Sequence, residues 1–161
     1  MKRNYVALLL LFAVLLPACA AQSRGADELL AAFAAGYGPM PAGQSYQSTA
    51  KEWEAGYLSP TLSDALYTED NGENALSCCQ SYAIFLSSAF AGGEIGFFHC
   101  PGQEEAVRVA EMCRARLARV RQTRPGAAFL QGACVLRYDK TVVLLMLPDN
   151  ARAKAVCDAM L

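Results

Sequence analysis

The chain has 161 residues, a formal net charge of −1 and a mean hydropathy of +0.19. The near-neutral charge and a pI of about 5.8 argue against a general attraction for nucleic acid. The length suits a single domain with its own core, which would not depend on disulfides to fold.

The first nineteen residues have the layout of a secretory signal. The basic residues Lys2 and Arg3 precede an apolar run over Val6–Leu16, which is shorter than the ~20 residues that a membrane-spanning helix needs. A Leu-Pro-Ala-Cys sequence ending at Cys19 resembles the bacterial lipoprotein box, in which the cysteine is lipidated and becomes the mature N-terminus. The alternative is ordinary secretion, with cleavage after Ala20.

The export signal predicts where the protein acts. A diacylglyceryl group on Cys19 would carry two acyl chains, which suffice for stable membrane attachment. We therefore expect a lipid anchor on the extracytoplasmic face of a bacterial membrane, with an envelope protein or a cell-wall component as a further candidate partner. Release as a secreted protein is the alternative localisation.

The chain after the leader is expected to begin with a spacer over residues 20–25 and to continue as one domain over 26–161. Asp27 is the predicted N-cap of a first helix, which should end in the glycine-containing stretch 36–39. Two prolines, a glycine and polar residues predict a loop over 39–48.

Two short helices are predicted next. Thr49 and Glu52 have the spacing of a capping box, which would start a helix ending near Ala55. Ser59 followed by Pro60 has the pattern of an N-cap and a first helical residue, which predicts one or two further helical turns.

The second half of the chain has a different pattern, in which strands alternate with longer helices. The expected elements are strands over 81–89 and 94–100, a helix over 103–122, strands over 133–139 and 141–147, and a final helix capped by Asp149 or Asn150. The segment 141–147 is apolar on both faces, which indicates a central strand. The order β-β-α-β-β-α predicts an α+β domain with an antiparallel sheet of about four strands and helices packed on one face.

The stretch Gly93–Phe98 places an acidic residue ahead of alternating apolar residues, and the charged helix Gln103–Arg121 follows it. Together with the hairpin over 134–147 and the last helix over 148–160, these segments resemble the family called domain of unknown function 4358. The resemblance covers at most residues 58–161. It implies this fold and an envelope setting, since the members are lipoproteins and secreted proteins of Gram-positive bacteria, and it implies no activity. The family is not rich in cysteine, whereas this chain is.

Six cysteines follow the leader: Cys78, Cys79, Cys100, Cys113, Cys134 and Cys157. An even number in an exported protein suits disulfides, and six cysteines allow fifteen pairings, among which the sequence does not choose. Adjacent cysteines rarely bond to each other, so the two at 78 and 79 would need different partners. The alternative is buried thiols, because the last three cysteines fall on predicted inward faces.

Sequence motifs for catalysis and for metal binding are missing. No C-x-x-C pair occurs and His99 is the only histidine, so neither a metal site nor another cofactor is predicted. His99 and Cys100 would point to opposite faces of one strand, which does not suit a Cys–His nucleophile. The alternative function is a thiol-dependent enzyme or redox protein using Cys78, Cys79 or Cys100, and it requires an accessible thiol of lowered pKa.

Arginines are concentrated in the predicted long helix and just after it. They are Arg108, Arg114, Arg116, Arg119, Arg121 and Arg124. Such a face could contact anionic lipid headgroups or cell-wall polymers. The alternative is a solvated helix face whose cations suit the negative C-terminal end of the helix dipole.

Aromatic residues are frequent in the first half of the domain. Tyr37, Tyr46, Trp53, Tyr57 and Tyr67 would suit stacking on a glycan, or would pin irregular segments onto the core. Since no catalytic motif is present, the sequence predicts an exported, lipid-anchored envelope protein with a non-catalytic binding or interaction domain.

Overall fold

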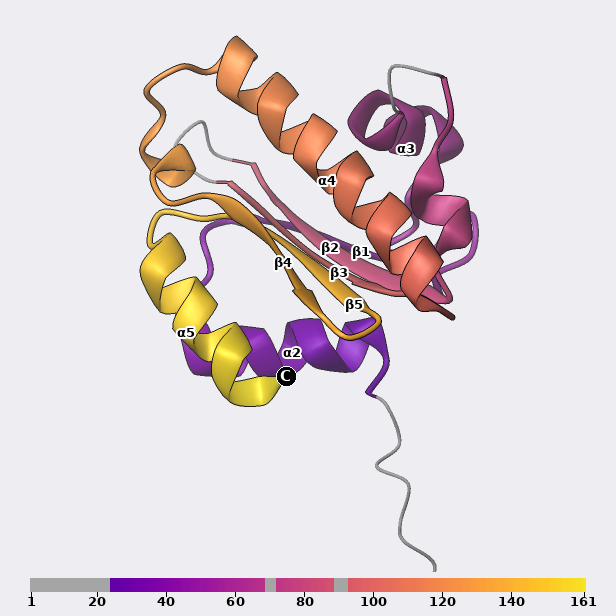
Figure 1. Cartoon of the computed structure of the whole chain (residues 1–161), viewed down its shortest axis with the longest axis horizontal. Coiled ribbons are helices and arrows are strands. Elements are labelled where there is room, and N and C mark those ends of the chain that lie inside the picture. Colours follow the sequence, from indigo (N-terminus) through magenta and orange to yellow (C-terminus); the bar gives the residue numbers. More distant parts are fainter. Residues whose placement is uncertain (1–23, 69–71, 89–92) are drawn as a thin grey trace, which may run out of the picture.

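The computed structural model describes residues 24–68, 72–88 and 93–161, so the leader and Cys19 lie outside the described residues. Figure 1 shows the arrangement of the helices and strands. In chain order they are α2 (Ala26–Tyr37), β1 (Gly43–Gln47), α3 (Pro60–Tyr67), the 3-10 helix η1 (Ala75–Cys78), β2 (Ser81–Ser87), β3 (Glu94–His99), α4 (Gln103–Thr123), the 3-10 helix η2 (Ala128–Leu130), β4 (Cys134–Tyr138), β5 (Thr141–Met146) and α5 (Asn150–Met160).

The strands form one antiparallel sheet in the order β1-β2-β3-β5-β4. The predicted α+β class and the order β-β-α-β-β-α of the second half are confirmed. β5 is a central strand, buried along its whole length between β3 and β4, as its apolar sequence predicted. The connection from β3 through α4 therefore passes over β5 before the chain returns to it from β4.

Helices cover both faces of the sheet, and the expectation of helices on one face was wrong (Figure 1). Phe98, Val142 and Leu144 pack on the side of α4, with α3 and η1 beside that helix. Phe97 and Val143 face the opposite layer, which α2 and α5 build. Since β3 and β5 carry apolar side chains on both faces, one layer of helices would leave half of these side chains in water.

The sheet has a fifth strand where a loop was expected. β1 is paired with β2 from Gly43 opposite Ser87 to Gln47 opposite Ala83. It is an edge strand whose side chains are exposed or half-buried. The sequence Gly-Gln-Ser-Tyr-Gln lacks the apolar alternation that reveals half-buried strands. Backbone pairing with β2 and the packing of Tyr46 against the core hold it in the sheet.

The short helix expected over 49–55 is wrong, because this segment forms consecutive turns. The carboxylate of Glu54 accepts a hydrogen bond of 2.9 Å from the backbone N–H of Lys51. Trp53 has a φ of 74°, in the left-handed region that interrupts any helix. The next prediction is confirmed, since the hydroxyl of Ser59 accepts from the N–H of Leu62 and caps α3.

The ends of the outer helices follow the sequence with one exception. α2 begins after Gly25 rather than after Asp27, which lies inside the first turn. It ends at Gly38, whose φ of 97° takes the chain out of the helix. α5 begins as predicted, with the carboxylate of Asp149 accepting from the N–H of Arg152 at 2.9 Å. Across the described ranges, no helix combines the length and the apolar character needed to traverse a bilayer.

Candidate functional site

A cleft of about 250 Å³ lies where the C-terminal half of α4 meets the adjoining ends of β2, β3 and β5. Its size is just below the roughly 300–1,000 Å³ of typical small-molecule pockets. The polar residues that line it are Ser87, Glu94, Arg116, Thr123 and Arg124. The apolar ones are Leu86, Val120, Phe129 and Met146. The lining is more polar than that of a typical small-molecule pocket, with several polar groups beside the apolar residues.

Glu94 is the central acidic group of the cleft wall. It is the first residue of β3 and is buried, with a relative exposure of 3%. One carboxylate oxygen accepts a hydrogen bond of 2.5 Å from the hydroxyl of Tyr67, which reaches it from the end of α3. The other oxygen accepts from Nε and Nη2 of Arg116 at 3.1 and 2.9 Å. The buried charge is therefore paired and hydrogen-bonded, as a buried carboxylate requires.

Tyr67 stays neutral in this arrangement. Burial raises the pKa of Tyr67 well above 10.0, and the negative charge of Glu94 beside it acts in the same direction. The ring packs edge-on against Phe98, with 5.8 Å between the centroids. The hydroxyl is thus a permanent donor at neutral pH, which fixes the direction in which Glu94 points.

Arg116 is held by one edge of its guanidinium and not by the other. Glu94 occupies the Nε–Nη2 edge, whereas Nη1 forms no hydrogen bond with any described residue. Arg116 lines the cleft, and 19% of its side chain is exposed. A guanidinium presents two parallel N–H groups on its outer edge, which match the two oxygens of a carboxylate or phosphate. The arrangement can therefore bind an oxyanion with a cation that is already oriented.

The charges around the cleft favour an anion. Arg116 and Arg124 contribute two positive charges to the lining, and Glu94 contributes one negative charge. The hydroxyl of Thr123 donates to the carbonyls of Arg119 and Val120 within α4, so its proton is already used inside the helix. Among the described residues, the lining thus contains two cationic groups and one anionic group beside its apolar residues.

The six arginines expected to form one anionic-contact face have separate roles. Arg108 pairs with Glu73, and Arg119 donates to the carbonyls of Leu66 and Thr68 at the end of α3. Arg121 donates to the carbonyl of Ala133 at 2.9 Å. Four of the six, with Arg116, thus hold other segments of the fold.

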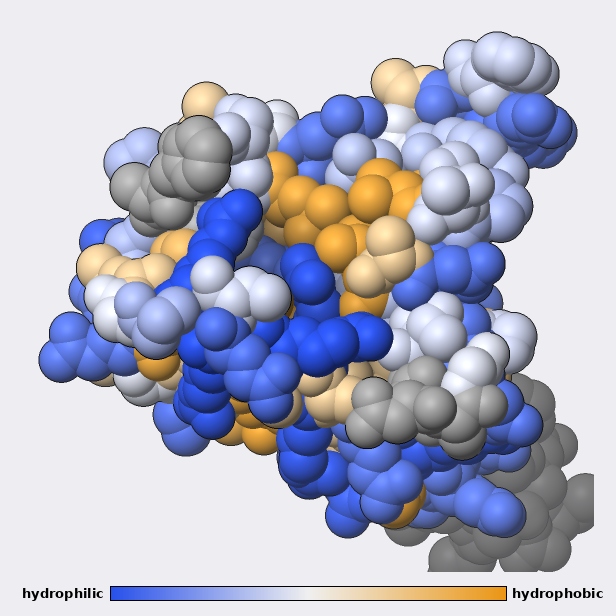
Figure 2. Space-filling view, turned by 90° about the horizontal axis from the view of Figure 1, so that it is seen from above, coloured by the Kyte–Doolittle hydropathy of each residue, from blue (hydrophilic) through white to orange (hydrophobic). Residues whose placement is uncertain are grey.

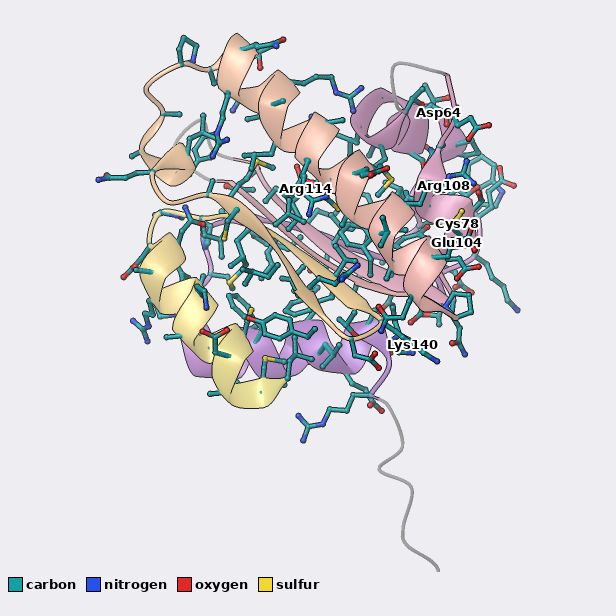
Figure 3. All side chains as sticks on the ribbon, viewed as in Figure 1. Asp64, Cys78, Glu104, Arg108, Arg114 and Lys140 are labelled. Atoms are coloured by element: carbon teal, nitrogen blue, oxygen red, sulfur yellow. The ribbon has the colours of Figure 1, made fainter. Side chains whose placement is uncertain are left out.

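The surface over α4 reflects this division. Arg114 is exposed and forms no hydrogen bond or ion pair with the described residues, and Figure 3 shows it on a different side of α4 from Arg108. Figure 2 shows that this side of the molecule mixes hydrophilic areas with a central apolar area, so it is not uniformly charged. Contact with anionic polymers stays a prediction, with Arg114 as its most accessible residue on the helix.

The six described cysteines are free thiols and fall on two sides of the sheet. Cys78, Cys79, Cys100 and Cys113 belong to the α4 side, and Cys134 and Cys157 to the α2–α5 side. Burial raises the pKa of Cys113 and of Cys134, and it raises the pKa of Cys157 to about 12. The structure therefore separates the cysteines into groups that the sequence could not define.

The redox alternative requires a thiol that is both accessible and of lowered pKa. Accepting a hydrogen bond from Cys79 lowers the pKa of Cys100, but Cys100 is fully buried. Cys79 is half-buried, and the hydrogen bond that it donates raises its pKa. Accessibility thus belongs to Cys79 and the lowered pKa to Cys100. This division suits a disulfide between the two residues better than reaction of either one with a substrate.

His99 lies apart from the cleft, at the other end of β3. Its Nδ1 is 3.2 Å from the hydroxyl of Thr141 on the neighbouring strand. No three His, Cys, Asp or Glu residues within 24–68, 72–88 and 93–161 are grouped so that they could hold a metal ion. His99 therefore has a structural contact with Thr141 on the neighbouring strand.

The aromatic residues of the first half do not form one glycan platform. Tyr37 and Tyr67 are buried on opposite sides of the sheet. Tyr46 and Tyr57 are half-buried, and Trp53 alone is strongly exposed, at 93%. Tyr37, Tyr46 and Tyr67 therefore pack in or against the core, in agreement with the second interpretation of the sequence.

Sequence reasoning missed the roles of Glu94 and Tyr67. A signal was present, because a single acidic residue at the start of the apolar segment Glu94–Phe98 predicts a buried charge that needs a partner. The partner could not be identified, since Arg116 is one of several arginines on a charged helix.

Comparisons with known proteins found no match: no family model, no curated protein and no solved structure resembles the chain significantly. The resemblance of the second half to the domain of unknown function 4358 stays a prediction.

Proposed function

We propose that this protein is a non-catalytic binding domain of the bacterial cell envelope, and that its cleft takes a small organic anion with an apolar tail. The observation that carries the proposal is the way in which the guanidinium of Arg116 is held. Its guanidinium is fixed by Glu94 on one edge and has the outer edge without a hydrogen-bond partner among the described residues.

Preorganisation supports binding at this site. An arginine that must be ordered on binding loses side-chain freedom, which costs about 0.5–1.5 kcal/mol. Arg116 is already ordered by Glu94, and Glu94 is ordered by Tyr67. A carboxylate on the outer edge of Arg116 would gain two charge-assisted hydrogen bonds, while its tail lies against Phe129 and Met146.

The first experiment is a titration of the purified protein with hexanoate, followed by isothermal calorimetry and by amide NMR shifts. Binding should shift the amides of residues 93–94 and 116–124, and it should weaken as salt is added. Hexanol, which has the same apolar length without the charge, should bind at least tenfold more weakly. Equal binding of hexanoate and hexanol, or no binding of either, would refute the proposal.

Arg116→Lys is the matched variant, because it keeps the charge and removes the paired N–H groups. We expect it to weaken hexanoate binding about tenfold, which corresponds to ~1.4 kcal/mol. Arg114→Lys is the control, since Arg114 is on the same helix, is exposed and does not line the cleft. A similar loss in both variants would show that the net charge, and not the cleft, binds the anion.

The envelope location is part of the proposal and rests on the sequence around Cys19. Intact mass of the protein from bacterial membranes tests it. A chain that starts at Cys19 and carries a diacylglyceryl group is the expected species. A chain that starts near Ala21 and is found in the medium would replace the lipid anchor with secretion.

A further inference from the structure

We propose that Cys79 and Cys100 form a disulfide that joins the end of η1 to the end of β3. The proposal is independent of the ligand cleft, which lies at the opposite end of β3. It selects one pairing from those that the sequence leaves open.

The strand register brings these two residues together. β2 and β3 are antiparallel neighbours, with Ser81 opposite His99. The N–H of Gln80 donates to the carbonyl of His99 at 2.8 Å and continues the ladder by one step. The register therefore places Gln80 opposite Cys100, and Cys79 lies one residue further along at the same end of the ladder. Neighbouring strands at a ladder end have the backbone separation that a disulfide spans.

The side chains meet as well. The thiols of Cys79 and Cys100 are close enough to shift each other's pKa, that of Cys79 upward and that of Cys100 downward. Both side chains pack in the cluster on the α4 side of the sheet. Cys134 and Cys157 belong to the other side, so the sheet separates them from this pair.

Cys78 and Cys113 are the local competitors. Cys78 is adjacent to Cys79 in sequence and half-buried, and Figure 3 shows it on the η1 side of α4, as it does Arg108. Cys113 is fully buried on α4 and influences the pKa of Cys79. Of the three cysteines, only Cys79 shifts the pKa of Cys100.

Disulfide formation needs an oxidant, and a small disulfide such as glutathione disulfide supplies it. The half-buried Cys79 attacks one sulfur of the oxidant as a thiolate and forms a mixed disulfide, which releases one glutathione thiolate. The Cys100 thiolate then attacks the Cys79 sulfur and releases the second. The two cysteines lose two protons and two electrons, and the oxidant becomes two thiols.

The order of these steps follows from the exposure of each sulfur, while the raised pKa of Cys79 makes its attack on the oxidant the slow step. The accessible residue meets the oxidant, and the buried residue with the lowered pKa attacks from within the protein. An exported protein would meet disulfide oxidoreductases of the same chemical class.

The experiment oxidises the reduced full-length protein with glutathione disulfide and maps the bond after cleavage at glutamate without reduction. Cleavage after Glu73, Glu94 and Glu104 separates peptide 74–94 from peptide 95–104. The two should remain joined, with a mass lower by two hydrogens than the sum of the reduced peptides. Fragmentation between residues 78 and 79 identifies the bonded cysteine.

Two adjacent residues provide matched variants. Cys78→Ser should keep the joined peptides, and Cys79→Ser should lose them. In the wild type and in Cys78→Ser, a reducing agent should lower the thermal midpoint, whereas Cys79→Ser should show no such shift. Both measurements use the same oxidised protein.

A bond from Cys78 or Cys113 to Cys100 in the wild type would overturn the proposal. Full alkylation of the six cysteines from Cys78 to Cys157, in denaturant after oxidation, would also overturn it. Joined peptides in Cys79→Ser but not in Cys78→Ser would assign the bond to the neighbouring residue and refute the pairing.

Discussion

The side-chain amide of Asn150 donates to the backbone carbonyl of Phe129 at 2.9 Å and so ties the start of α5 to the wall of the ligand cleft. The same amide group donates to the carbonyl of Gln131, and its oxygen accepts from the N–H of Leu147. Asn150 is buried, with 3% exposure. One side chain thus satisfies three backbone groups from segments that have no regular pairing.

Asn150→Ala should lower the free energy of unfolding by about 2–4 kcal/mol, because it leaves buried backbone groups without partners. Urea denaturation followed by circular dichroism measures the change. Gln122→Ala is the control, since Gln122 is exposed on α4, and it should change stability by less than about 0.5 kcal/mol. A loss below 1 kcal/mol in Asn150→Ala would mean that water replaces the amide.

Tyr67→Phe should lower the free energy of unfolding at pH 7 by about 1.5–3 kcal/mol. The variant keeps the ring against Phe98 and removes the hydrogen bond to the Glu94 carboxylate. Chemical denaturation of both proteins at pH 7 gives the difference. An unchanged stability would contradict the role assigned to the hydroxyl.

The same pair predicts a pH dependence. Burial raises the folded-state pKa of Tyr67 above 10.0, so the folded protein keeps this proton where the unfolded chain has lost it. Stability from this proton is complete below pH 10 and falls as the pH rises above it. The difference between wild type and Tyr67→Phe should therefore shrink between pH 10 and pH 11. A constant difference would mean that Tyr67 titrates normally.

Gly93→Ala should destabilise the protein by more than about 3 kcal/mol and distort the cleft. A Cβ atom at Gly93 would overlap the backbone carbonyl of Met146 on β5, which cannot move without disturbing the central strand. Thermal unfolding measures the loss. At Gly25 a Cβ would meet only the exposed carboxylate of Asp27, so Gly25→Ala should cost less than about 1 kcal/mol.

Trp53→Gly should raise the free energy of unfolding by up to about 1 kcal/mol, because glycine adopts the positive φ of this turn without steric cost. The side chain is 93% exposed, so little packing is lost. Trp53→Ala keeps a Cβ and should leave stability unchanged. Circular dichroism is the suitable measurement, since Trp53 is the only tryptophan. Equal effects of both variants would show that backbone strain is not the cause.

The sequence predicted secondary structure best where one face of an element is buried over several turns. Residues Ala106, Ala110, Cys113, Leu117 and Val120 form the buried face of α4 that their spacing indicated. β1 was missed because an edge strand with polar side chains carries no apolar alternation. The prediction of a helix over 49–55 was wrong because a capping pattern describes a helix start and does not ensure that a helix follows, and Trp53 has a positive φ.

The candidate site was less predictable than the fold. Glu94 and Arg116 are 22 residues apart, on a strand and on a helix that crosses the sheet, so their contact depends on tertiary packing. Arginines that cap or pair with other segments have the same sequence signal as arginines that face solvent. Only the positions of the carbonyls of Leu66, Thr68 and Ala133 distinguish the two.

The contact of Arg119 with the end of α3 links the opening of α3 to the opening of α4. α3 has eight residues, fewer than the ~12–15 that an isolated helix needs to persist in water. The carbonyls of Leu66 in its last turn and of Thr68, the residue that caps its end, accept hydrogen bonds from a side chain 53 and 51 positions further along. When α4 leaves the sheet, these carbonyls lose their donor and α3 loses its end. The amide protons of α3 should therefore exchange with solvent only as fast as α4 detaches, so the two helices would open as one unit.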